Sequence, residues 1–170
     1  MKKRLFFKCQ QGASAVEFAI VLPLLLLFVF GIIEFGILLY NKAVITNASR
    51  EGARAASLFR TTTDGTPTYL PQGALGDNGS TSVRGVVNQY CANHLISFGG
   101  STTPSTTVVP ASGAGGTPPD EYRTVTVLFP YNFLVLPNIL AGFFGGSGTL
   151  SGPIPLQAVT QMRTEYQGGL

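Results

Sequence analysis

The sequence is poor in the residues from which catalytic and metal sites are built. In 170 positions it has no tryptophan, one histidine (His94), two cysteines and eight acidic residues. No nucleophile–base set, metal-ligand spacing or nucleotide loop can be assembled from them. We therefore expect no catalytic residue, no metal site and no cofactor, and an anchored envelope enzyme is the least favoured class of function.

The two cysteines do not form the framework of a disulfide-rich domain. Cys9 lies in the N-terminal basic segment, and Cys91 lies far along the chain. If that segment is removed, Cys91 has no partner within the chain. We expect Cys91 to be a small, buried apolar side chain.

The formal charge of +3 does not indicate a nucleic-acid binder. Four of the eleven Lys and Arg residues lie in the first twelve positions, and all eight acidic residues come later. Residues 13–170 therefore carry seven basic and eight acidic side chains, a net charge of −1 before the termini. No basic stripe remains for a phosphate backbone. The N-terminal basic cluster is typical of a segment that stays in the cytoplasm.

The long apolar run from Phe18 to Tyr40 dominates the first third of the chain. Its 23 residues exceed the roughly 20 that a membrane-spanning helix needs. A cleaved secretory signal would place a shorter apolar core directly after the basic residues, followed by a small-x-small cleavage site. Here nine residues separate Lys8 from the run, and no such site stands between Glu34 and Tyr40.

Two interpretations of the apolar run remain, and Glu17 separates them. A plain signal anchor explains the length and the charge asymmetry, but it gives no reason for an acid at the head of the span. A prepilin-type leader cut after Gly12 would make Ala13 the new N-terminus and Glu17 the fifth mature residue. A carboxylate near the hydrocarbon costs about 2.5–3.5 kcal/mol at the centre of a span and less near the interface. In a filament, a neighbour's new α-amine could neutralise it, and we favour this interpretation.

We expect one helix of about 45 residues from about Ala13 to Phe59, with its first half facing lipid or other subunits. The chain is thus divided into three parts: a leader at 1–12, a membrane and assembly helix at 13–60, and an extracytoplasmic α+β domain at 61–170. Glu34, near the outer end of the span, is expected to reach the membrane interface or to contact another membrane helix.

The second half of this helix carries a row of small residues. Ala48, Gly52 and Ala56 recur every four positions, which lets another backbone come close. Arg54 is expected to pair with Glu51 at i, i+3. We assign the row, Arg54 and Glu34 to helix packing and assembly.

The rest of the chain predicts a small α+β domain. An apolar stripe predicts a second helix at 83–98, with His94 or Leu95 at its end, and residues 61–82 are expected to form a loop. Alternation predicts strands at about 106–110, 121–129 and 154–166, and Arg123, Val125, Val127 and Phe129 should face the helix. The strongly apolar stretch 131–144 is too short to span the bilayer in this form. It is expected to enter the outer leaflet, to cover the core or to contact a subunit.

Four segments resemble one known family. Gly12–Pro23 (GASAVEFAIVLP), the Glu34-containing half of the span and Arg50–Ala56 (REGARAA) resemble TadE-like proteins, and Ala158–Arg163 is similar to the family's closing strand. These proteins are pseudopilins or minor pilins of the tight-adherence (Flp) pilus system. The resemblance implies that a prepilin peptidase cuts after Gly12 and that Glu17 takes the position of the pilin glutamate.

The resemblance also implies a structural role and a set of partners. The chain is expected to be a pseudopilin or minor pilin-like component that assists Flp pilus assembly. It would be a single-pass inner-membrane protein with a cytoplasmic N-terminus and a periplasmic domain, or a component of the pilus itself. Its partners would be the prepilin peptidase, the major Flp pilin, sister pseudopilins, the inner-membrane assembly platform and the lipid bilayer, with no nucleic acid. The alternative is a single-pass, membrane-anchored extracytoplasmic interaction protein without processing.

Overall fold

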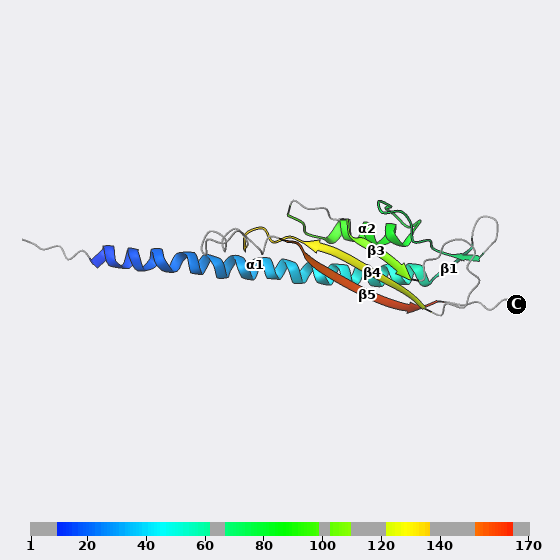
Figure 1. The fold of residues 1–170 in the computed structure, drawn as a ribbon, viewed down its shortest axis with the longest axis horizontal. Helices are drawn as coiled ribbons and strands as arrows, with labels where there is room; N and C mark the ends of the chain where they lie inside the picture. Colours follow the sequence, from blue (N-terminus) through cyan, green and yellow to red (C-terminus); the bar gives the residue numbers. More distant parts are fainter. Residues whose placement is uncertain (1–9, 62–66, 99–102, 110–121, 137–151, 165–170) are drawn as a thin grey trace, which may run out of the picture.

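One helix runs through most of the length of the molecule. The computed structural model describes residues 10–61, 67–98, 103–109, 122–136 and 152–164. Within them α1 (Gln10–Ser57) is a single helix of 48 residues that continues through Pro23. At 1.5 Å per residue it is roughly 72 Å long. Figure 1 shows its first half projecting beyond the sheet and its second half lying alongside it. The predicted long helix is confirmed.

A three-stranded antiparallel sheet lies along the second half of α1. Its order is β3 (Ser105–Val109), β4 (Tyr122–Tyr131) and β5 (Ile154–Arg163), with β4 in the centre. Val125 of β4 pairs with Val108 on one side and with Thr160 on the other. The predicted set of three antiparallel strands is confirmed, and with it the α+β fold class.

The two faces of the sheet differ in burial. Along β4 buried and more exposed residues alternate, which is the pattern of a sheet with one covered face. The predicted inward set is confirmed. Its members are all buried: Arg123, Val125, Val127 and Phe129. They form one core with α1, α2 and the inward residues of β3 and β5.

The second helix, α2, packs against α1 and β3 and is shorter than predicted. It spans Val83–His94, and the Oγ of its N-cap Ser82 accepts a hydrogen bond from the Gly85 amide at 3.0 Å. The predicted end at Phe98 is wrong. Leu95 already has extended backbone, and the next residue, Ile96, makes two backbone hydrogen bonds to the side chain of Asn41 on α1, at 2.7 and 3.0 Å. These bonds replace the helical ones that Ile96 would otherwise make.

The structure also shows which of the two candidates, His94 or Leu95, ends the apolar stripe on α2. Leu95 is buried, whereas His94 is exposed, stacks on Tyr90 and lies with its Nδ1 2.9 Å from the Tyr90 carbonyl oxygen. Leu95 therefore continues the stripe, and His94 lies at its edge.

A small hairpin was missed in the predicted loop at 61–82. Strands β1 (Phe59–Thr61) and β2 (Pro67–Tyr69) pair antiparallel. The prediction of a loop is therefore wrong at 61 and 67–69, and the prediction of helix is wrong at Phe59. The guanidinium of Arg123 lies 4.6 Å from the centroid of the Tyr69 ring. This contact between a buried cation and an aromatic face ties the hairpin to β4.

Candidate functional site

The first half of α1 is exposed along most of its length in the part of the chain that the structure describes. No residue from Gly12 to Ile33 is buried, and the first buried residue of α1 is Glu34. We call residues 12–33 the bare half and residues 34–57 the covered half. Large apolar side chains are exposed along the bare half: Val16, Phe18, Ile20, Val21, Leu24, Leu25, Leu26, Phe28, Val29, Ile32 and Ile33. Among the described residues, α1 is the one helix long and apolar enough to cross a membrane.

The three residues of the predicted processing site lie in the first turns of the bare half. Gly12, Ala13 and Glu17 are all exposed and all helical. Ala13 and Glu17 are four positions apart, so their side chains lie on the same face of α1. The structure thus brings the proposed new N-terminus and the acid to adjacent turns.

Glu34 has a different environment from Glu17. Only 4% of it is exposed, and its carboxylate accepts three backbone hydrogen bonds from consecutive residues after β4. Oε1 accepts from the amides of Leu134 at 2.8 Å and Val135 at 2.5 Å, and Oε2 accepts from Leu136 at 3.1 Å. We call this arrangement the Glu34 latch. Neither environment expected from the sequence, the open interface or another membrane helix, is the one found.

Aromatic side chains extend the latch along α1. The Tyr131 hydroxyl donates to the Glu34 carbonyl oxygen at 3.3 Å. The Phe133 ring meets the rings of Tyr131 and Phe35 edge-on, with centroids 5.3 and 5.8 Å apart. The segment after β4 therefore returns along α1 to the boundary between its two halves, as Figure 1 shows.

In the covered half, the predicted row of small residues packs inside the chain. Ala48, Gly52 and Ala56 are all buried. A Cβ on Gly52 would lie 2.6 Å from Cγ2 of Val87 on α2 and 3.3 Å from Cγ1 of Val125 on β4. The row lets α2 and the sheet approach the α1 backbone, which is the packing role expected of small residues. A role for it in contacts between subunits stays a prediction.

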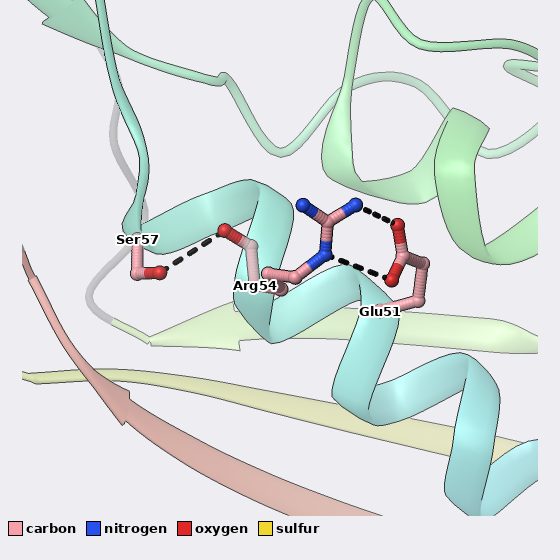
Figure 2. A network of polar contacts seen from close by, with 3 residues as sticks. All are labelled: Glu51, Arg54 and Ser57. Carbon is pink, nitrogen blue, oxygen red and sulfur yellow. Dashed lines mark hydrogen bonds and ion pairs between the residues drawn. The ribbon is translucent and has the colours of Figure 1, made fainter.

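Arg54 lies on the exposed side of α1, opposite this row. Its Nε donates to Oε2 of Glu51 at 3.0 Å, and its Nη2 contacts Oε1. Figure 2 shows this pair beside the Ser57 hydroxyl, which donates to the Arg54 carbonyl oxygen at 3.0 Å. The hydrogen bonds and the charge of Arg54 lower the pKa of Glu51, and partial burial opposes them. The same pairing raises the pKa of Arg54. Such an exposed pair contributes little to folding.

Cys91 is a buried free thiol on α2, as predicted. Burial raises the pKa of this thiol to about 12, so it is almost wholly protonated at neutral pH. Protonated thiols are poor nucleophiles and metal ligands. Nor do any three His, Cys, Asp or Glu side chains in the described part of the chain gather closely enough to hold a metal ion.

These features define a class of protein: a small α+β domain built on the end of a helix that could span a membrane. Residues 12–54 match the model of a family described as TadE-like protein, in agreement with the resemblance found in the sequence. The match lies entirely within α1. It begins at Gly12, covers the bare half and includes the small-residue row up to Arg54. Neither the curated proteins nor the solved structures contain a significant match to the chain.

Sequence reasoning missed two contacts of α1 with distant parts of the chain. Asn41 holds the chain after α2, and the amides of 134–136 hold Glu34. A signal for the second was present: an acid within the apolar run and a second apolar stretch at 131–144 both lacked a partner.

Proposed function

We propose that this chain is a pseudopilin or minor pilin-like component of tight-adherence pilus biogenesis, cut by a prepilin peptidase after Gly12. The observation that carries the proposal is where the family match begins. It starts at Gly12, the residue before the proposed cut, and continues through Glu17 and the bare half of α1.

The bare half is suited to membrane storage and to filament packing. It is a rod of exposed apolar side chains without a covering element in the described residues. Such a surface needs lipid or other apolar helices around it. Before assembly the bilayer would surround it, and in a filament the bare halves of other subunits would.

Cleavage after Gly12 would place a positive α-amine at the start of α1. The N-terminus of a helix already carries partial positive charge, so an added cation there is unfavourable and a nearby carboxylate is favourable. No acidic residue lies in the first turn of α1 as it stands. Glu17 is the first acid that a new α-amine at Ala13, or that of a neighbouring subunit, would meet.

Mass spectrometry of the protein purified from cells with a working peptidase tests the cut. We expect a chain that begins at Ala13, and a chain retaining residues 1–12 in cells that lack the peptidase. Gly12→Leu should also retain the leader, because a bulky side chain replaces the glycine at the cut. A native chain that keeps Met1 would support the alternative, a plain membrane-anchored interaction protein.

Substitutions at Glu17 test the charge pairing separately from the cut. Glu17→Ala and Glu17→Gln should be cleaved and inserted at wild-type levels but should impair pilus formation. Glu17→Asp keeps the charge and should retain more assembly than Glu17→Gln. Pili and adherence at normal levels in Glu17→Gln cells would show that charge neutralisation is not the role of Glu17. Co-purification with sheared pili then distinguishes a filament subunit from an assembly factor.

A further inference from the structure

The Glu34 latch lies below the water boundary that the sequence of α1 sets. The apolar run ends at Tyr40, and polar Asn41 and Lys42 follow it. Glu34 precedes Tyr40 by six residues, which is about 9 Å along a helix. If α1 spans the bilayer up to Tyr40, the segment bound to Glu34 lies at the depth of the outer leaflet.

The side chains around the latch are apolar and at least partly exposed. Leu134 is 50% exposed, and Val135 and Leu136 are partly exposed. This patch adjoins exposed Phe35 of α1 through the Phe133 ring and is continuous with the exposed apolar surface of the bare half. Leu136 lies over α1 at Gly31, where a Cβ would be 3.8 Å from its Cδ2.

Three consecutive amides of this segment also meet the requirement for entering lipid. An unpaired amide in hydrocarbon costs several kcal/mol, so irregular backbone is excluded from lipid unless its polar groups are satisfied within the protein. The Glu34 carboxylate accepts from all three consecutive amides, of residues 134, 135 and 136. Those three hydrogen bonds in turn compensate a carboxylate that is itself almost fully buried.

We propose that residues 133–136 form a second membrane contact, inserted into the outer leaflet beside α1 and held there by Glu34. The exported domain is then fixed to the bilayer at two points, the helix and this segment. The inference rests on the membrane placement of α1 within the proposed function, but it does not depend on pilus assembly.

The absence of tryptophan from the chain makes a direct test available. Three chains, each with one tryptophan, are compared in phosphatidylcholine vesicles that contain brominated phosphatidylcholine, which quenches tryptophan on contact. Leu134→Trp tests the segment, Phe28→Trp reports the span, and Leu75→Trp is a control at an exposed position of the domain. We expect Leu134→Trp to be quenched several-fold more than Leu75→Trp. Bromines near the headgroup end of the acyl chains should quench it more than bromines near the bilayer centre.

The same fluorescence separates the outcomes. If Phe28→Trp is quenched and Leu134→Trp is not, α1 spans the membrane and the second contact is wrong. A Leu134→Trp chain shielded from both lipid and aqueous acrylamide would assign the patch to a second copy of the chain and overturn the lipid contact. An unquenched Phe28→Trp would overturn the membrane placement and the inference together.

The role of Glu34 is tested in the Leu134→Trp chain. Adding Glu34→Ala removes the acceptor of three amides, and we expect less lipid quenching and a red-shifted emission. Glu51→Ala, which removes an exposed carboxylate from the same helix, is the matched control and should change neither. Circular dichroism verifies that each domain is folded. Unchanged quenching in a folded Glu34→Ala chain would show that Glu34 does not hold the segment in the membrane.

Discussion

The two halves of α1 use opposite side chains for opposite surroundings. The bare half exposes Leu, Ile, Val and Phe, whereas the covered half buries Ala48, Ser49, Gly52, Ala53 and Ala56. The bare half thus carries large apolar residues on the outside of this monomer, whereas the covered half carries small residues, together with Val44 and Ile45, in its core. Large apolar side chains suit a helix surface that will be surrounded by lipid or by other subunits. Where α2 and the sheet must approach the α1 backbone closely, large side chains at the contact are excluded.

The sharpest test of this difference compares the same substitution in the two halves. Ile45 is fully buried, and Ile32 is 73% exposed. Ile45→Ala should lower the free energy of unfolding of the domain by about 2–5 kcal/mol, because it removes packed atoms and leaves a cavity. Ile32→Ala should leave it nearly unchanged. Denaturant unfolding in detergent, followed by circular dichroism, measures both, and equal losses would contradict the division of α1 into two halves.

A second pair of substitutions tests how closely α2 and the sheet approach the backbone of α1. A Cβ on Gly52 would collide with the stiff, β-branched side chain of Val87, whereas nothing lies within 4 Å of one on Gly36. We expect Gly52→Ala to destabilise the domain by about 1–2 kcal/mol through overpacking, even though alanine favours the helix. Gly36→Ala is the control for helix propensity and should not destabilise. If both variants unfold at the wild-type denaturant concentration, the packing at Gly52 is looser than described.

The smallest effect is expected at the exposed pair of the covered half. The pKa of Glu51 is lowered in the folded state from its ordinary value near 4.5. The stabilisation from its pairing with Arg54 is therefore present above that value and is lost as the pH falls through the lowered pKa. Glu51→Gln should reduce the decrease in the free energy of unfolding at acid pH. The effect should be small and should decrease further as salt is added, because salt screens exposed charges. Denaturant unfolding curves at neutral and acid pH measure this effect. If the wild-type and Glu51→Gln proteins show the same pH dependence, the Glu51–Arg54 pair does not contribute to stability.

Much of the fold could be predicted because its patterns are local. The long apolar run, the alternation in β4 and the small-residue row each specify a structure from neighbouring residues alone. The inward set of β4 followed from period-two alternation, even for Arg123, whose charge argues against burial. Its aromatic contact with Tyr69 lies in a hairpin that was not predicted, although the turn signal Asp64-Gly65 stands between its two strands in the sequence.

The errors arose where distant residues compete with local preference. The sequence predicts α2 up to Phe98, but Asn41 binds the backbone of Ile96, 55 positions away, and the helix ends at His94. Glu34 binds amides about 100 positions along the chain. The backbone partner in such a contact leaves almost no trace in sequence, because almost any residue supplies the amide. For Glu34 the only signal was the acid within the apolar run and the second apolar stretch at 131–144. The proposed processing residues Gly12, Ala13 and Glu17 are the reverse case, since their spacing can be recognised in the sequence while all three are exposed in the structure.

The helix α1 continues from the bare half into the covered half without interruption, so no hinge separates the two halves. A force applied to the bare half along the helix axis is therefore transmitted directly to the contacts of the small-residue row with α2 and the sheet. The strands of the sheet run lengthwise beside α1 (Figure 1). Such a load is shared in shear by many contacts at once instead of opening them one after another. The α+β domain would therefore move together with the bare half of α1 as one rigid body.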